Sequence, residues 1–217
     1  MKIRLSLFFL SFFVFFVFTL FSYSVAKEAW QQIDFDSTVK IQDKIPRYWD
    51  GYFSYFSFIG SAEVTIGIAL ILAILSIIRL KFWSFVGWLL IFPASFFEVF
   101  GKLVVFHPGP PVLFHRNILE TTLPSFYIHT NFSYPSGHMT RTVFLITVLL
   151  ILALTWRSLF IKWVVILALV FLGLMMTLTR VYLGEHWLSD VLGGGLLGLT
   201  AGLFASGLIL AKKKSLR

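Results

Sequence analysis

The segment TRVYLGEHWLSD at 179–190 places Arg180, His186 and Asp190 between two long apolar runs. Charged side chains in apolar surroundings are costly, so their presence here indicates a function. His186 and Asp190 are four residues apart at the predicted start of a helix, where they share one face and can touch. A carboxylate that holds one imidazole nitrogen fixes the tautomer of the ring and makes the other nitrogen a better nucleophile. We therefore interpret His186 as a nucleophile and Asp190 as its partner.

A second segment, PSGH at 135–138, offers groups that bind an anion. Ser136 and Gly137 precede a predicted helix, whose free backbone N–H groups and dipole favour negative charge. His138 could protonate a leaving group, while Lys102 and Arg180 add fixed positive charge. Together with the nucleophile, these groups suit phosphoryl transfer, in which positioning and charge stabilisation supply most of the rate.

The composition indicates that this chemistry takes place at a membrane. Hydrophobic residues make up 58% of the 217 residues, and 26 residues are Phe. A soluble domain of this length would lack the polar surface to cover so much apolar material. The chain has no cysteine, which excludes disulfides, thiolate nucleophiles and thiolate metal sites.

The apolar runs predict an all-α fold, a single domain over residues 1–217 built as a bundle of six transmembrane helices. The core covers about 60–210, and residues 1–59 hold the first span and a segment along the membrane interface. An alternative for the first span is a signal peptide cleaved after Ser24-Val25-Ala26, which would leave five spans and the same orientation. The six spans are expected at roughly 5–25, 60–78, 82–104, 140–156, 160–179 and 187–210.

The distribution of charge predicts the orientation of these spans. The formal charge of +8 does not indicate nucleic-acid binding, because the basic residues follow the positive-inside pattern. Both termini are expected in the cytoplasm, most simply that of a bacterium with the protein in its cytoplasmic (inner) membrane. Lys102, His138, Arg180 and His186 then all lie at the extracytoplasmic face. Ten Lys and Arg, and no Asp or Glu, lie on the predicted cytoplasmic side: Lys2, Arg4, Arg79, Lys81, Arg157, Lys162, Lys212, Lys213, Lys214 and Arg217.

Over residues 60–210 the sequence resembles the type 2 phosphatidic acid phosphatase (PAP2) family, whose core is shared with vanadium haloperoxidases. The family motif Pro-Ser-Gly-His stands intact at 135–138, and Ser-Arg-x5-His-x3-Asp stands at 179–190 with Thr179 in place of Ser. The resemblance implies that His186 forms a phosphohistidine, with Asp190 as its partner and His138 as the general acid. The phosphate would be held by Lys102, Ser136, Gly137 and Arg180.

The remaining family motif, Lys-x6-Arg-Pro, departs from the pattern. Counted from Lys102, the expected Arg-Pro pair is Gly109-Pro110, so one guanidinium is missing from its usual place. Arg116 and Arg141 are the candidates to replace it. We favour Arg116, because a loop residue is re-aimed more easily than a helical one, and expect Arg116→Ala to lower turnover by at least about tenfold.

The resemblance implies a lipid phosphatase that hydrolyses a phosphate or diphosphate on a lipid held in the bilayer. Phosphatidate, phosphatidylglycerol phosphate and undecaprenyl diphosphate all fit. A lipid phosphotransferase and a catalytically silent binder of anionic lipid are the alternatives. We expect no cofactor and no metal, because only Asp190 and Glu185 are carboxylates near the histidines in sequence.

Other polar and small residues have simpler interpretations. His107, His115 and His129 match no motif and are interpreted as loop residues. Glu98 and Lys102, four apart, predict an ion pair or a catalytic role for Glu98. The glycines at every fourth position of the last span predict close helix packing: Gly194, Gly198 and Gly202.

Overall fold

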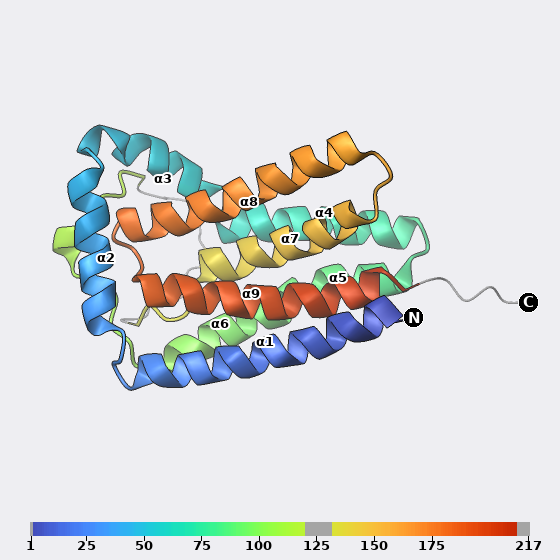
Figure 1. Cartoon of the computed structure of the whole chain (residues 1–217), viewed down its shortest axis with the longest axis horizontal. Helices are drawn as coiled ribbons and strands as arrows, with labels where there is room; N and C mark the ends of the chain where they lie inside the picture. Colours follow the sequence, from blue (N-terminus) through green and yellow to red (C-terminus); the bar gives the residue numbers. More distant parts are fainter. Residues whose placement is uncertain (1, 120–131, 212–217) are drawn as a thin grey trace, which may run out of the picture.

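The computed structural model describes residues 2–119 and 132–211. Within them the chain is almost entirely helical, which confirms the predicted all-α fold (Figure 1). The helices are α1 Lys2–Ala26, α2 Gln31–Lys44, α3 Asp50–Phe58, α4 Ala62–Ile78, α5 Phe82–Leu89, α6 Ile91–Val104, α7 Gly137–Leu154, α8 Leu159–Tyr182 and α9 Leu188–Ile209. Short 3-10 turns occupy Arg47–Trp49 and Val112–Phe114.

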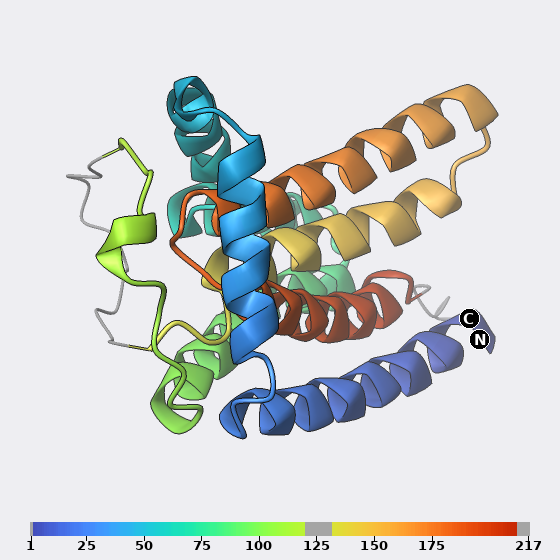
Figure 2. The ribbon, with the colours of Figure 1, turned by 60° about the vertical axis from the view of Figure 1, so that its left-hand side comes forward.

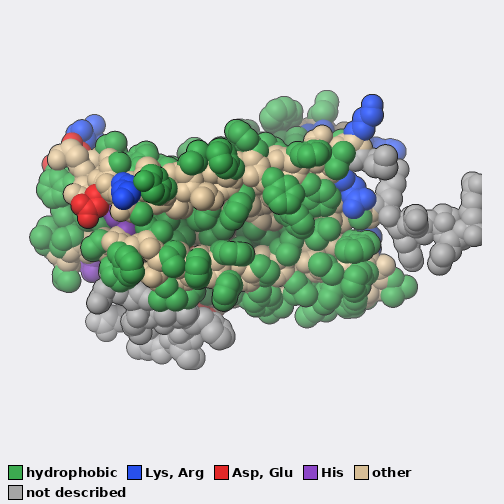
Figure 3. All heavy atoms as spheres, turned by 90° about the horizontal axis from the view of Figure 1, so that it is seen from below, with side chains coloured by type: hydrophobic (Ala, Val, Ile, Leu, Met, Phe, Trp, Pro, Cys, Tyr) green, Lys and Arg blue, Asp and Glu red, His purple; other side chains and the backbone are tan. Residues whose placement is uncertain are grey.

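Six helical segments of the described chain are long and apolar enough to cross a membrane. Their bounds are Lys2–Ala26, Arg47–Ile78, Phe82–Val104, Gly137–Leu154, Leu159–Tyr182 and Leu188–Ile209, which confirms the six predicted spans. In Figure 3 apolar side chains cover the middle of the visible face, and charged side chains gather toward its two ends. This is the surface that a bilayer requires of a protein that spans it.

The third span differs from its prediction because it is two helices, α5 and α6, rather than one. The chain breaks at Leu90, and Pro93 lies in the first turn of α6. Proline is tolerated in a first turn but cannot donate to a preceding carbonyl, so an uninterrupted helix through this point is disfavoured.

Helix α9 lies at the centre of the bundle, with α1 on one side and α7 on another (Figures 1 and 2). A Cβ atom at Gly194 would lie 2.3 Å from the Ser136 carbonyl oxygen, and one at Gly198 would lie 2.3 Å from that of Thr140. Only glycine permits this approach of two backbones. The predicted role of these glycines in close helix packing is confirmed.

The first span packs along α9. Ser11 Oγ donates to the Thr200 carbonyl at 2.8 Å, and Arg4 Nε donates to that of Gly207 at 2.8 Å. These contacts make α1 part of the bundle, as the six-span interpretation expects.

Helix α2 lies across one end of the bundle, hereafter the α2 end, and belongs to the segment predicted to lie along the interface (Figures 1 and 2). Its buried face carries Asp34, Thr38 and Gln42, one residue per turn. Gln42 Nε2 donates to the carbonyls of Phe114 at 2.7 Å and Tyr182 at 2.8 Å. Polar contacts therefore hold this helix against the C-terminal end of α8 and the Phe114 turn.

The opposite end of the bundle holds the first residue of α1, the α4–α5 turn and the α7–α8 turn (Figure 1). Of the six described members of the predicted cytoplasmic set of basic residues, four belong to these segments: Lys2, Arg79, Lys81 and Arg157. The other two, Arg4 and Lys162, lie in the first turns of α1 and α8. The last four members of the set lie outside the described residues: Lys212, Lys213, Lys214 and Arg217.

Candidate active site

The ends of four helices bring the predicted site residues together at the α2 end. Lys102 lies in the last turn of α6, His138 in the first turn of α7, Arg180 in the last turn of α8 and Asp190 in the first turn of α9. The Ser136 N–H donates to the Asp190 carbonyl at 3.0 Å, which joins the starts of α7 and α9. Residues far apart in the sequence thus form one site.

His186 and Asp190 pair as the sequence predicts. His186 Nδ1 lies 3.5 Å from Asp190 Oδ2, and the same oxygen accepts from the Trp187 N–H at 2.9 Å. Asp190 is fully buried and His186 is 8% exposed. Because Nδ1 faces the carboxylate, Nε2 is the ring nitrogen that can attack a substrate.

The surroundings of His186 favour its neutral form. Burial is the largest cause that holds the pKa of this imidazole well below its usual 6.5. The positive charges of Arg180, Lys102 and Arg141 lower this pKa further. A neutral imidazole is the nucleophilic form, so His186 is available for attack at neutral pH.

His138 lies within electrostatic range of His186 and of the same three cations. Unlike His186 it is partly exposed at the surface. The site therefore holds two imidazoles among positive charges, as a nucleophile and a proton donor around a phosphate require.

Lys102 and Arg141 share one buried carboxylate. Lys102 Nζ lies 2.7 Å from Glu98 Oε1, and Arg141 Nη1 donates to Glu98 Oε2 at 3.3 Å. This confirms the predicted Glu98–Lys102 ion pair and adds a third member to it. A Cβ atom at Gly137 would lie 2.8 Å from Glu98 Cδ and 2.9 Å from Arg141 Nη1, so the motif glycine leaves room for this group.

Arg180 is held by two side chains that were not predicted to bind it. Its Nη1 donates to Ser57 Oγ of α3 at 2.5 Å, and its Nη2 donates to Glu185. Glu185 also accepts from Asn117. The Arg180 guanidinium is thereby held against the loop that carries His186.

Several buried polar side-chain atoms in the described residues have no hydrogen-bond partner, and most of them belong to this site. Buried polar groups are almost always satisfied within folded proteins, so a cluster of exceptions indicates that a polar ligand binds there. The site atoms that a ligand could satisfy are Ser136 Oγ, Arg141 Nε and Arg180 Nε. His186 Nδ1 and Asp190 Oδ1 also make no hydrogen bond, but they face Asp190 and His107.

The structure separates the two candidates for the missing guanidinium. Arg116 Nη2 donates to the Gln42 carbonyl at 3.2 Å, and its Nη1 donates to Ile45 O and Tyr182 Oη, both at 3.2 Å. These contacts hold Arg116 against α2. Arg141, by contrast, donates to Glu98 and lies within electrostatic range of His138 and His186. The expected phosphate-binding role of Arg116 stays a prediction that these contacts do not support. A loop arginine binds the nearest available acceptors, and for Arg116 these include the carbonyls of Gln42 and Ile45 at the end of α2.

His107 lies in the loop after α6, as predicted, but it does not face the solvent. Its side chain is buried, and Nε2 lies 3.7 Å from Asp190 Oδ1 and 3.7 Å from Asp34 Oδ2. The spacing of Asp34, Thr38 and Gln42 along one face of α2 is the sequence signal that could have indicated a buried polar contact here. His115 is exposed, as expected of a loop residue, and His129 lies outside the described residues.

Among the described residues, no cluster of three or more His, Asp or Glu side chains has the arrangement of a metal site. The predicted site residues that the structure brings together are Lys102, Ser136, Gly137, His138, Arg180, His186 and Asp190.

Comparisons with known proteins agree with this architecture. The crystal structure of a PAP2-type phosphatidylglycerolphosphate phosphatase from Bacillus subtilis is similar, with a TM-score of 0.71, 18% identity, and coverage of 91% of this chain and 94% of that chain. The structure of LpxE from Aquifex aeolicus has a TM-score of 0.54, 23% identity, and coverage of 80% and 94%. No curated protein matches the sequence. The sequence model of the PAP2 superfamily matches residues 84–214, more than half of the chain, and the protein therefore belongs to the PAP2 superfamily.

Proposed function

We propose that the protein is a membrane lipid phosphatase that hydrolyses a phosphate or diphosphate ester through a phosphohistidine intermediate. The observation that carries this proposal is the pairing of His186 with Asp190 beside three cations, in a buried cluster where Ser136 Oγ, Arg141 Nε and Arg180 Nε have no hydrogen-bond partner. Membership of the PAP2 superfamily and the fold shared with the Bacillus subtilis phosphatidylglycerolphosphate phosphatase support it.

The reaction would proceed in two displacements. His186 Nε2 attacks phosphorus, the P–O bond to the lipid breaks, and His138 gives its proton to the departing oxygen. Asp190 stabilises the positive charge that develops on the His186 ring. Water then attacks the phosphohistidine and gives a proton to His138, and the P–N bond breaks to release phosphate and restore both imidazoles.

Three cations would hold the phosphate during these steps. Lys102, Arg141 and Arg180 stabilise its negative charge, while Ser136 Oγ and the free N–H groups at the start of α7 donate to its oxygens. Arg141 would serve in place of the motif arginine that is Gly109 here. The alternative of a catalytically silent lipid binder rested on the absence of an arginine at Gly109. If Arg141 supplies that guanidinium, this argument for a silent binder is lost.

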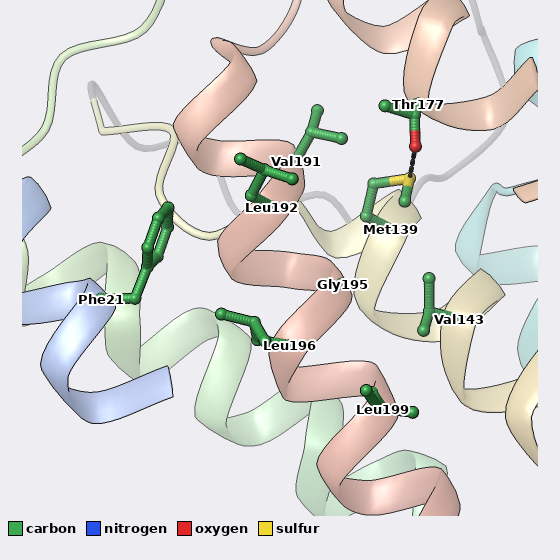
Figure 4. A pocket seen from close by; sticks show the side chains of 9 residues that line it. All are labelled: Phe21, Met139, Val143, Thr177, Val191, Leu192, Gly195, Leu196 and Leu199. Atoms are coloured by element: carbon green, nitrogen blue, oxygen red, sulfur yellow. Dashed lines mark hydrogen bonds between the residues drawn. The ribbon is translucent and has the colours of Figure 1, made fainter. Parts of the chain in front are cut away.

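An apolar groove of about 340 Å³ beside the site is suited to the lipid chain (Figure 4). Met139 and Val191 line it, and they directly follow His138 and Asp190 in the chain. The one hydroxyl in its lining, that of Thr177, donates to the Gly173 carbonyl at 3.0 Å. The full lining is Phe21, Met139, Val143, Thr177, Val191, Leu192, Gly195, Leu196 and Leu199. A substrate with its phosphate at the helix ends could therefore keep its chain among apolar side chains.

The test is phosphate release by the purified protein from a panel of lipid phosphates, with His186→Ala as the blank. Phosphatidate, phosphatidylglycerol phosphate and undecaprenyl diphosphate form the panel, because each has a charged head on an apolar tail. Release from at least one of them, absent from the blank, supports the proposal, and no release from any of them contradicts it.

One addition to this test refines the reaction type. Product analysis with and without an acceptor alcohol separates a hydrolase from a lipid phosphotransferase, since only the transferase forms a new phosphate ester.

We also propose that turnover needs no divalent metal and that the site lies on the extracytoplasmic face. Loss of activity in EDTA with rescue by magnesium would count against the first point, and labelling of the site residues from the cytoplasm would count against the second.

A further inference from the structure

A second carboxylate–imidazole pair lies behind Asp190, on the side away from His186. It consists of Asp34 of α2 and His107, which follows α6. Asp34 is 2% exposed and His107 is 6% exposed. Neither residue is one of the specified positions of the three family motifs, since His107 lies in the variable stretch between Lys102 and Gly109. Asp34 also lies outside the region that the family model matches.

Asp34 fixes the start of the helix that carries Asp190. Its Oδ1 accepts from the Ser189 N–H at 2.8 Å, and its Oδ2 accepts from Ser189 Oγ at 2.7 Å. A carboxylate at a helix start satisfies backbone donors that have no partner within the helix and interacts favourably with the helix dipole. The first turn of α9 is therefore held from outside by α2.

The His107 ring lies between the two carboxylates. Its Nε2 is 3.3 Å from Ser189 Oγ, 3.7 Å from Asp34 Oδ2 and 3.7 Å from Asp190 Oδ1. The backbone of this residue is also held, since Ser133 N–H donates to the His107 carbonyl at 3.0 Å. The imidazole thus faces one oxygen of Asp190, while the other oxygen faces His186.

The chemistry of the three groups favours a proton on Nε2. Two buried carboxylates near one another repel, and a donor between them relieves that repulsion. Burial lowers the pKa of His107 and raises that of Asp34, although the hydrogen bonds from Ser189 oppose the rise. A neutral ring with its proton on Nε2 can donate to Ser189 Oγ at 3.3 Å, and this proton then lies near a carboxylate oxygen on either side, each 3.7 Å from Nε2.

We propose that His107, held by Asp34, is a positioning residue that fixes Asp190 and through it the orientation of His186. The inference rests on the proposed phosphatase function. The contacts of His107 and Asp34 lead to Asp190 and to Ser189, so we expect them to act on the rate of attack rather than on substrate binding. The relay runs from Asp34 through His107 and Asp190 to His186.

The test compares kcat, KM and inhibition by vanadate, a mimic of pentacoordinate phosphorus, in wild type and four variants. His107→Ala removes the ring, and His107→Gln restores an N–H donor of similar reach. Asp34→Ala removes the carboxylate, and Asp34→Asn keeps its shape without its charge. His115→Gln and Asp43→Asn are matched controls, because His115 and Asp43 are exposed in the same loop and helix.

We expect His107→Ala and Asp34→Ala to lower kcat by about 10- to 100-fold and to weaken vanadate inhibition in parallel, because both depend on the orientation of His186, while KM stays within about twofold of wild type. His107→Gln should recover at least about fivefold of the loss, and Asp34→Asn should lie between wild type and Asp34→Ala. The two controls should match wild type. Melting temperatures of all variants in detergent accompany the kinetics.

Wild-type kcat in His107→Ala and Asp34→Ala would overturn the inference while leaving the proposed function intact. A parallel loss of kcat, substrate affinity and melting temperature, with no recovery in His107→Gln, would also overturn it, because that pattern belongs to a merely structural pair. Inactivity of the wild-type protein toward every lipid phosphate would instead remove the proposed function, and this inference with it.

Discussion

Arg141 of α7 donates to Glu98 of α6 at 3.3 Å, and this contact sets a guanidinium beside Lys102 in the last turn of α6. The family motif places an arginine seven residues after its lysine, where this chain has Gly109. Arg141 enters the same cluster from another helix, one turn after His138. The site thus has a guanidinium beside its lysine, although the arginine that supplies it lies on α7 and not seven residues after Lys102.

Arg141→Ala should therefore lower kcat/KM by about 100-fold, because a bidentate donor to the phosphate would be lost. Arg116→Ala should lower the melting temperature but change kcat/KM by less than about threefold, because Arg116 holds α2 through backbone carbonyls. Arg157→Ala, at an exposed position of the opposite end, is the control. Loss of activity in Arg116→Ala, together with normal activity in Arg141→Ala, would instead assign the phosphate-binding guanidinium to Arg116.

Gly109→Arg should restore activity to Arg141→Ala. A Cβ atom at Gly109 would lie 3.5 Å from Ser133 Cβ, which is ordinary contact, so a side chain is accommodated there. We expect the double variant to recover at least about tenfold of the kcat/KM that Arg141→Ala loses. No recovery in the double variant, at an unchanged melting temperature, would show that an arginine at position 109 does not reach the phosphate.

Much of this site could be predicted from the sequence, because the bilayer restricts where charged residues can lie. Long apolar runs identify the spans, and counting them places Lys102, His138, Arg180 and His186 at one end. The break between α5 and α6 was missed because Pro93 lies inside a continuous apolar run. The contacts of Arg116, Asp34 and His107 depend on how α2 docks across the bundle, and such tertiary contacts have no local sequence pattern.

The pH dependence of kcat/KM should have its acid limb below pH 6.5. Attack requires neutral His186, so the rate falls as pH drops through the pKa of this residue. Burial and the neighbouring cations lower that pKa below its usual 6.5, which moves the limb to more acidic pH. Loss of the proton that His138 donates gives the alkaline limb, and a flat profile from about pH 5 to about pH 9 would contradict the paired roles.

The packing of α9 against α7 predicts opposite effects for two alanine substitutions three residues apart. Gly198→Ala places a Cβ atom 2.3 Å from the Thr140 carbonyl oxygen and should destabilise the protein by about 1–3 kcal/mol. Gly195→Ala meets nothing within 4 Å and should be neutral or raise stability by up to about 1 kcal/mol. Thermal unfolding in detergent measures both. A Gly198→Ala protein as stable as Gly195→Ala would show that the two helices pack less closely.

The most direct test of the account is to trap labelled phosphate on the protein during turnover of a lipid phosphate. We predict an acid-labile phosphoprotein whose label maps to His186, and its loss in His186→Ala. His138→Ala should still form it if the leaving group needs no proton, as a nitrophenyl phosphate does. Label on another residue, or retained label in His186→Ala, would contradict the assignment of His186 as the nucleophile.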